Sequence, residues 1–235
     1  MKNFLTVVAG DFLHLLAPSL CPGCDDPVPP RERGICPSCR ASLETAPYPE
    51  EIFQDLLARF SPEELALDAV GALYNFEPDS PVQRVIHAIK YRGCRALGET
   101  LGEELALSMQ IFPEFRDIDI IVPVPLHRAR LRERGFNQAE AIARGIQSAW
   151  NVQVRTDILR RTRHTQSQTR LSATARQKNI SSAFVTAGQD LRGVSVALCD
   201  DVFTTGATLN ACALQLHLAG ADSVRALTLA RDEHQ

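Results

Sequence analysis

Aromatic side chains are scarce in this chain of 235 residues, where they make up 6% of the composition. The single tryptophan, the three tyrosines and Phe136 are scattered along the sequence, so no clear platform exists on which the bases of a single strand would stack. Long apolar runs are also lacking. No stretch approaches the roughly 20 apolar residues that a membrane-spanning helix requires. We therefore expect no transmembrane span, and the sequence gives little support for direct stacking of a nucleic-acid strand.

The N-terminal segment lacks the features of a secretory signal. Asp11 and His14 interrupt its apolar run, and only Lys2 precedes that run. Apolar residues at helical spacing predict an amphipathic helix over residues 1–18. This helix either packs on its own protein or contacts a partner or a membrane. The expected location is the cytoplasm, with peripheral association at the inner face of the membrane left open.

Neither sign of charge dominates the chain, whose net charge is −3. This total predicts no strong attraction to nucleic acid as a whole. The distribution is lopsided, however. Residues 116–178 contain 13 lysines and arginines against 5 acidic residues, a local net of +8, so the rest of the chain carries −11. A segment of this kind favours contact with anions over a merely solvated charged face.

Four of the seven cysteines form two C-x2-C pairs separated by eleven residues. Each pair turns tightly enough to aim two thiolates at one point, and two pairs complete a tetrahedral zinc site. Two disulfides are the alternative, which a cytoplasmic location disfavours. Four thiolates leave no open position for water, so the zinc should be structural. The predicted ligands are Cys21, Cys24, Cys36 and Cys39, and we expect the other cysteines to be inert core residues, namely Cys94, Cys199 and Cys212.

Strand and helix patterns alternate after a predicted linker over residues 46–66, and the central strands are apolar throughout. This predicts an α/β fold with a mainly parallel sheet flanked by helices over residues 67–235, preceded by a small zinc module over residues 19–45. The expected strands are Ala69–Phe76, Ile118–Val122, Val154–Leu159, Ala183–Thr186, Val194–Cys199 and Val224–Leu229. The expected helices are Pro81–Tyr91, Leu97–Gln110, Phe136–Trp150 and Ala207–Ala219.

The stretch Val196–Leu209 reads VALCDDVFTTGATL. Ligands of parallel sheets bind beyond the carboxyl ends of strands, where Asp200 and Asp201 should emerge. The following turn into a helix offers unpaired backbone N–H groups to an anion, and Gly206 lets that backbone approach closely. Hydroxyls of the threonines add donors, while the two carboxylates accept from neighbouring hydroxyls. A phosphate beside vicinal hydroxyls is a ribose 5-phosphate.

The residues Val196–Thr208 resemble, at every position, the phosphoribosyl diphosphate (PRPP) loop of type I phosphoribosyltransferases. Two further stretches, VPVPLHRARLRERGFNQAE and RTRHTQSQTRLSATARQKNISSAF, join the four-cysteine module in resembling the ComF family. Its members are competence-associated, phosphoribosyltransferase-like proteins. The resemblance covers nearly the whole chain and implies the fold named above, with an N-terminal module similar to a zinc ribbon.

The resemblance implies roles for individual residues. Asp200 and Asp201 would be catalytic, and the PRPP-binding residues would be Thr204, Thr205, Gly206, Ala207 and Thr208. The loop after the Ile118–Val122 strand would take the diphosphate and the segment Arg161–Asn179 would form a flexible hood, with the candidates His127, Arg128, Arg134, Asn137, Gln138, Gln166, Arg170, Arg176 and Asn179. For Asn137 and Gln138, capping of the next helix is an equal alternative. Mg²⁺ would accompany PRPP.

Two functions remain open at this point. The first is a PRPP-binding protein that acts in DNA uptake or utilisation, with or without transferase activity toward an unknown acceptor. The second is a non-catalytic module that senses PRPP or a nucleotide, or binds single-stranded DNA, and acts through DNA-uptake or helicase proteins. Release of pyrophosphate from PRPP on addition of candidate bases or nucleic acid would distinguish them.

Overall fold

The computed structural model describes residues 19–29, 32, 34–162 and 183–232. The helix expected over residues 1–18 and most of the expected hood lie outside these residues. Among the described residues, none of the helices combines the length and the hydropathy that crossing a bilayer demands.

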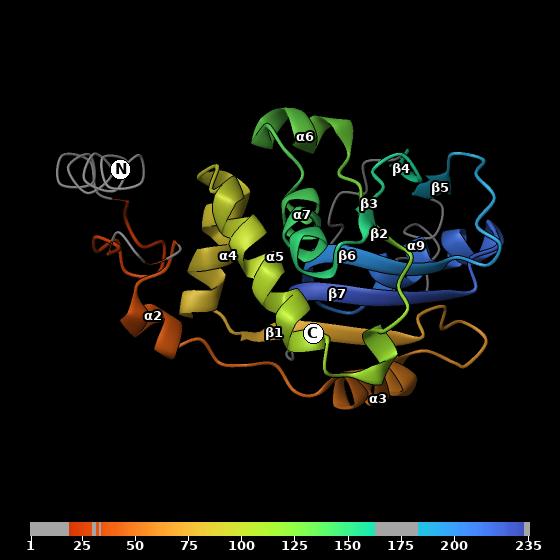
Figure 1. Ribbon diagram of the computed structural model, residues 1–235, viewed down its shortest axis with the longest axis horizontal. Helices are drawn as coiled ribbons and strands as arrows, with labels where there is room; N and C mark the ends of the chain where they lie inside the picture. The colour runs from red at the N-terminus through yellow and green to blue at the C-terminus, as the bar shows by residue number, and fades with distance from the viewer. Residues whose placement is uncertain (1–18, 30–31, 33, 163–182, 233–235) are drawn as a thin grey trace, which may run out of the picture.

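A five-stranded parallel sheet forms the centre of the molecule (Figure 1). Its strand order is β1-β7-β6-β2-β3, and each strand runs parallel to its neighbours. The strands are β1 (Ala69–Phe76), β2 (Ile120–Pro123), β3 (Gln153–Val154), β6 (Ser195–Phe203) and β7 (Ser223–Asp232). The central strands are buried on both faces, which explains their continuous apolar sequences and confirms the predicted sheet.

Helices cover both faces of this sheet. One core cluster joins the sheet to α4 (Pro81–Tyr91), α5 (Arg95–Met109) and α7 (Gln138–Trp150). The other joins the opposite face to α3 (Pro49–Arg59) and α9 (Ala207–Leu218). Helices α5 and α7 cross very closely, because a Cβ atom added at Gly145 would lie only 1.9 Å from the backbone oxygen of Glu99. Alanine at position 145 would therefore separate the two helices.

The structure differs from the sequence expectations in four segments. Helix α3 lies within residues 46–66, where we expected a linker, and it buries Ile52 and Leu56 against the sheet. The expected diphosphate loop contains a short helix, α6 (Arg128–Arg134). The strand expected over Val154–Leu159 is divided between β3 and β4 (Leu159–Arg161). Strand β6 continues four residues beyond Cys199.

A separate hairpin lies beside the sheet. Its strands β4 and β5 (Phe184–Thr186) pair in antiparallel register, with Leu159 opposite Thr186. Residues 163–182, which include most of the expected hood, follow β4 in the sequence and are outside the described residues. The remaining elements are the single-turn helix α2 (Pro37–Ala41), which carries Cys39, and the 3-10 turn η1 (Pro113–Phe115).

Candidate functional site

The two adjacent aspartates lie within β6 rather than after its end. Pairing of β6 with β2 ends where Pro123 faces Cys199, whereas pairing with β7 continues to Phe203. Asp200 and Asp201 therefore lie on the part of β6 that extends beyond the end of β2. This opening at the carboxyl end of β2 is the position at which parallel sheets bind ligands.

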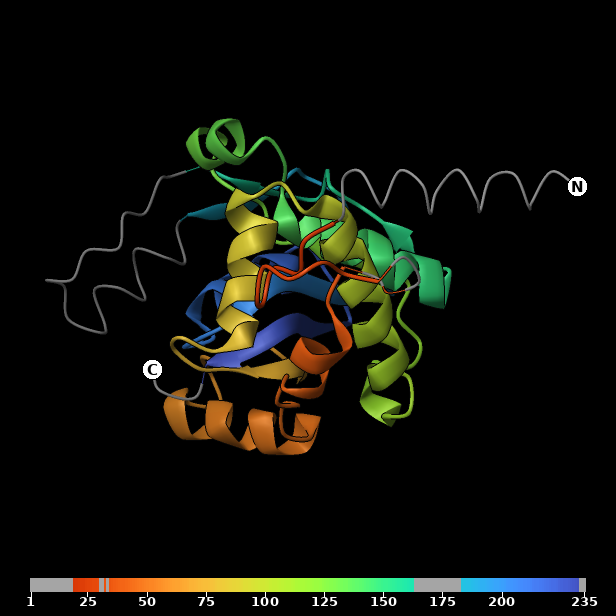
Figure 2. The same cartoon turned by 90° about the vertical axis from the view of Figure 1, so that its left-hand side faces the viewer.

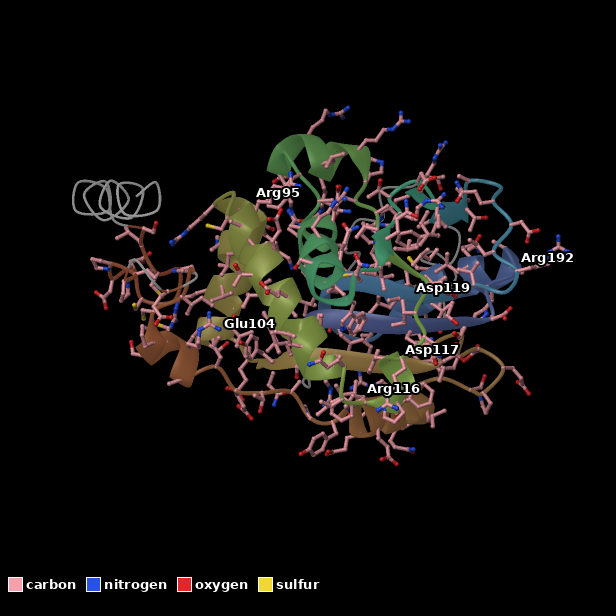
Figure 3. The ribbon with its side chains drawn as sticks, viewed as in Figure 1. Arg95, Glu104, Arg116, Asp117, Asp119 and Arg192 are labelled. Carbon is pink, nitrogen blue, oxygen red and sulfur yellow. The ribbon has the colours of Figure 1, made fainter. Side chains whose placement is uncertain are left out.

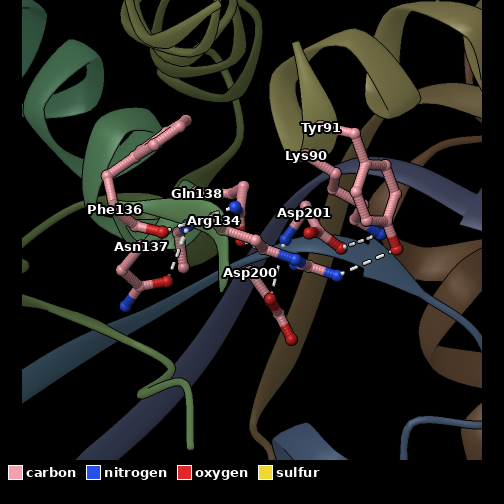
Figure 4. Close-up of polar contacts among 9 residues, drawn as sticks. Lys90, Tyr91, Arg134, Phe136, Asn137, Gln138, Asp200 and Asp201 are labelled. Atoms are coloured by element: carbon pink, nitrogen blue, oxygen red, sulfur yellow. Dashed lines mark hydrogen bonds and ion pairs between the residues drawn. The ribbon is translucent and has the colours of Figure 1, made fainter. Parts of the chain in front are cut away.

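The alternation of side chains along a strand sends the two carboxylates to opposite faces. Asp201 follows the parity of Cys199, which belongs to the core on the α4 side, and Asp200 follows that of Leu198, which belongs to the core on the α9 side. Figure 4 shows the carboxylate of Asp201 beside Lys90 and that of Asp200 separate from this contact. The adjacent acids consequently have different surroundings and different partners.

The carboxyl group of Asp200 has a shifted pKa. Burial, followed by the neighbouring charge of Asp201, raises the pKa of Asp200 to about 7. The backbone N–H of Asp201, which donates to Oδ1 of Asp200 at 2.9 Å, opposes the shift, as do the charges of Lys90 and Arg161. An acid that changes charge near neutral pH, at the end of a parallel strand, is typical of a functional site.

Asp201 is held by a lysine that the sequence analysis did not select. Lys90 Nζ lies 2.8 Å from Oδ1 of Asp201, and both side chains are largely buried. Lys90 belongs to the last turn of α4, four residues after the buried Ile86, so it prolongs the apolar stripe of this helix. The position of this lysine on the apolar face of a predicted helix is a sequence signal that it points toward the protein interior.

The turn after β6 has a left-handed residue at its centre. Gly206 has φ of +77° and is the N-cap of α9, where it carries no capping side chain. A Cβ atom there would lie 2.8 Å from Cδ2 of Leu56 and 3.0 Å from Cε2 of Phe203. The glycine is therefore required by the backbone conformation and by packing beneath the turn. This reason adds to the close approach to phosphate that the sequence suggested.

Hydrogen bonds to the segment before β1 hold the first turn of α9. Asn210 accepts from the N–H of Ala66 and donates to the carbonyl of Glu64, both at 2.7 Å. The hydroxyl of Thr205 accepts from the N–H of Ala207 at 3.4 Å. Four of the predicted phosphate-binding residues are half-buried at this turn, namely Thr204, Thr205, Ala207 and Thr208.

Two residues of the expected diphosphate loop act as helix caps. Nδ1 of His127 accepts from the N–H of Ala129 at the start of α6. Oδ1 of Asn137 accepts from the N–H of Ala139 at the start of α7, and its Nδ2 donates to the carbonyl of Val124. The capping alternative is thus what the structure shows for Asn137. Arg128, at the first position of α6, is exposed.

Arg134 lies beside the two aspartates, as Figure 4 shows. Its Nη1 donates to Oε1 of Gln138 at 2.8 Å, and its Nη2 donates to the hydroxyl of Tyr91 at 3.2 Å. The guanidinium also lies 5.0 Å from the centre of the Tyr91 ring. Gln138 is 1% exposed and therefore positions Arg134 instead of facing solvent.

The hairpin contributes one cation to the Asp200 side. Arg161, the last residue of β4, has its guanidinium 5.3 Å from the centre of the Phe184 ring. Burial lowers the pKa of Arg161, and the charge of Asp200 is among the interactions that oppose this shift. The other hood candidates, Gln166, Arg170, Arg176 and Asn179, lie outside the described residues.

The four predicted zinc ligands converge. The sulfur atoms of Cys21, Cys24, Cys36 and Cys39 all lie within 4.8 Å of one another. Hydrogen bonds from the hydroxyl of Ser38 and the N–H of Cys39 lower the pKa of Cys36 to about 6. This donor set could hold a metal ion such as zinc. Of the remaining cysteines, Cys199 and Cys212 are buried as expected, whereas Cys94 is only half-buried.

Comparison with known proteins agrees with this arrangement. The phosphoribosyl transferase domain family matches residues 110–235. Competence protein F of Haemophilus influenzae is 27% identical over 234 residues, which cover 97% of both chains. The DNA utilization protein YhgH of Escherichia coli K12 is 30% identical over 154 residues, which cover 64% of this chain and 67% of that one. The chain belongs to the ComF family.

Its similarity to ComF-family relatives extends across species. Competence protein ComFC of Bacillus subtilis is 25% identical over 93% of this chain and 88% of its own length. Among solved structures, a glutamine PRPP amidotransferase of B. subtilis superposes on 56% of this chain and 25% of that chain, with a TM-score of 0.39 and 19% identity. That likeness is too low to assign a substrate.

In this ComF-family chain, the residues brought together at the end of the sheet come from distant segments. Asp200, Asp201 and Arg134, which the sequence predicted, meet Lys90, Tyr91 and Arg161, which it did not select. His127 and Asn137 serve as caps nearby. The cysteine cluster lies apart from this site, beside α4 and α5.

Proposed function

We propose that the chain binds PRPP, or a related ribose phosphate, at the turn Thr204–Thr208 and the carboxylates of Asp200 and Asp201 beside it. The observation that supports this most is the acid pair on the part of β6 that extends beyond β2, followed by the turn into α9 in which Gly206 is left-handed. The backbone N–H groups of that turn would hold the 5-phosphate. The carboxylates would accept hydrogen bonds from the ribose hydroxyls.

Cations around the acid pair suit the other end of such a ligand. Arg134 lies beside the two aspartates, Lys90 of α4 contacts Asp201, and Arg161 of β4 interacts with the charge of Asp200. Guanidinium groups donate in a planar fork that matches phosphate oxygens. Diphosphate would therefore lie on the Arg134 side, where Arg128 and His127 are the further candidates.

Two metals belong to this proposal. Mg²⁺ would accompany PRPP, because diphosphate and ribose hydroxyls supply the oxygen ligands that it prefers. Zinc would occupy the four-cysteine cluster in a closed, structural site. If the chain is a transferase, the cations would stabilise the departing diphosphate while the hood excludes water.

The names of the relatives, competence and DNA utilization, suggest where such binding is used. We propose that the protein acts in the cytoplasm on incoming DNA, together with DNA-uptake or helicase proteins. One observation favours direct contact with DNA as a second function. Helix α6 has no buried residues and displays three exposed arginines, Arg128, Arg130 and Arg132.

Titration calorimetry with PRPP and Mg²⁺ tests the first proposal. We expect binding by the wild-type chain and at least about tenfold weaker binding after Asp200→Asn with Asp201→Asn, since each charge-assisted hydrogen bond contributes roughly 1.5–3 kcal/mol. Diphosphate alone should bind both proteins similarly. An absence of PRPP binding by the wild-type chain in the presence of Mg²⁺ would refute the proposal.

A further inference from the structure

Helix α4 contacts both the four-cysteine module and the proposed ribose-phosphate site. Figures 1 and 2 show the cysteine-bearing segment beside α4, on the side of the molecule remote from the β4–β5 hairpin. The last turn of the same helix carries Lys90 and Tyr91, which contact Asp201 and Arg134.

The contact with the module is specific to the first cysteine pair. Nε of Arg84 donates to the carbonyl oxygen of Gly23 at 2.7 Å, and Gly23 stands between Cys21 and Cys24. A Cβ atom at Gly23 would lie 2.8 Å from the sulfur of Cys39, so this carbonyl belongs to the tightest part of the thiol cluster. Arg92, just after α4, also pairs with Asp25 at 2.9 Å.

Apolar packing reinforces these polar contacts. Val28 and Ile35 of the module are buried in the same core cluster as Val82, Val85 and Ile89 of α4. A module that loses its fold would uncover this face of α4. Because metal binding supplies much of the folding free energy of a small four-cysteine module, the metal state bears on the position of the helix.

We propose that α4 couples the four-cysteine module to the ribose-phosphate site, and that Lys90 is the positioning residue through which the coupling acts. A metal-loaded module holds α4 so that Lys90 meets Asp201 and Tyr91 meets Arg134. Loss of the metal loosens the last turn of α4 and weakens PRPP binding. This regulation rests on the proposed PRPP function, although the movement of α4 does not.

A matched pair of variants tests the path of the coupling. Arg84→Gln removes the contact between the module and α4. Arg40→Gln removes a charged contact of the same module with α5, where Nη1 of Arg40 lies 2.7 Å from Glu104; Figure 3 labels Glu104 on the side of α5 that faces the module. Hydrogen exchange of the amides at 88–92 should accelerate in Arg84→Gln and not in Arg40→Gln. Equal exchange in the two variants would overturn the proposal.

PRPP affinity provides the second measurement. We expect Arg84→Gln to weaken binding about threefold, and removal of zinc by a chelator to weaken it about tenfold, within the range of such couplings. Both effects should vanish in a Lys90→Gln background, because the residue that transmits them is gone. Additive losses in that background would overturn the role of Lys90.

The two proposals fail separately. If the wild-type chain does not bind PRPP, the proposed function fails, and the exchange rates of the amides at 88–92 in zinc-loaded and chelated protein still decide the coupling. If PRPP binds but chelation changes neither exchange nor affinity, the coupling fails and the proposed function stands.

Discussion

Replacing Asp200 by asparagine should stabilise the folded chain above neutral pH while weakening ligand binding. Asparagine has nearly the shape of the protonated acid and retains an oxygen that can accept from the N–H of Asp201. It removes the charge that burial and Asp201 disfavour. The variant therefore tests whether the site holds a carboxylate at a cost to stability, as functional sites often do.

The pKa of Asp200 sets the size of the effect. This pKa is about 7 in the folded chain, against an ordinary value of 3.8. At about 1.36 kcal/mol per unit, ionisation of Asp200 would lower the free energy of unfolding by roughly 4 kcal/mol, an upper bound because part of the shift comes from the neighbouring charge of Asp201. Since the folded pKa is the higher one, this loss begins above pH 4, grows through pH 7 and is complete above it.

Urea unfolding at pH 5 and pH 8 measures this effect, with Trp150 as the fluorescent probe. Trp150 donates to the carbonyl of Ala106 and is half-buried, so its emission should report loss of the core. The stability gain of Asp200→Asn over wild type should be about 2–3 kcal/mol larger at pH 8 than at pH 5. Other titrating groups, including the cysteines, cancel in this comparison.

Asp157→Asn serves as a control of opposite sign. Hydrogen bonds from Arg155 hold the pKa of Asp157 below its ordinary value, so this carboxylate favours the folded state at pH 8. Its replacement should give no gain at either pH. A gain for Asp200→Asn that is the same at pH 5 and pH 8 would refute the reasoning about Asp200.

Three other outcomes are expected. Elemental analysis should find one zinc per chain, and Cys36→Ser should abolish it and unfold the module; a protein without stoichiometric zinc would contradict the site. Any DNA binding should be nonspecific and weaken with salt, and replacing Arg128, Arg130 and Arg132 by glutamine should reduce the slope against log salt by about two for single strands; binding indifferent to salt would exclude the basic segment. Gly206→Ala should lower the free energy of unfolding by about 1–3 kcal/mol, measured in urea, because of its positive φ and the contact with Leu56; an unchanged midpoint would argue against the left-handed turn.

Local patterns explain why much of the fold could be predicted from the sequence. The continuous apolar strands, the cysteine spacing and the turn after β6 each lie within about a dozen residues, so their meaning does not depend on distant segments. Helix α6 was missed because none of its residues is buried, which leaves no amphipathic pattern to detect. Helix α3 was missed because prolines at its start suggested a linker, although Pro49 occupies the first helical turn, where proline is tolerated.

The partners of the acids could not be read from the sequence in the same way. Lys90 lies 111 residues before Asp201, and Tyr91 lies 43 residues before Arg134. Only the packing of α4 against the sheet brings them together. Asn137 shows the converse case, because an amide before a helix is equally typical of a cap and of a ligand contact, and sequence alone does not separate the two.

The alternation of side chains along β6 predicts different surroundings for Asp200 and Asp201. Adjacent acids on a strand face opposite sides of the sheet, so each meets different neighbours. The structure gives Asp201 a buried cation and leaves Asp200 with the raised pKa. Loss of Asp201 would leave Lys90 unpaired and disturb α4. Loss of Asp200 would instead remove a charge that burial and the neighbouring Asp201 disfavour. Treating the acids as one catalytic pair hides this difference, and the two single variants should therefore differ in the sign of their effect on stability.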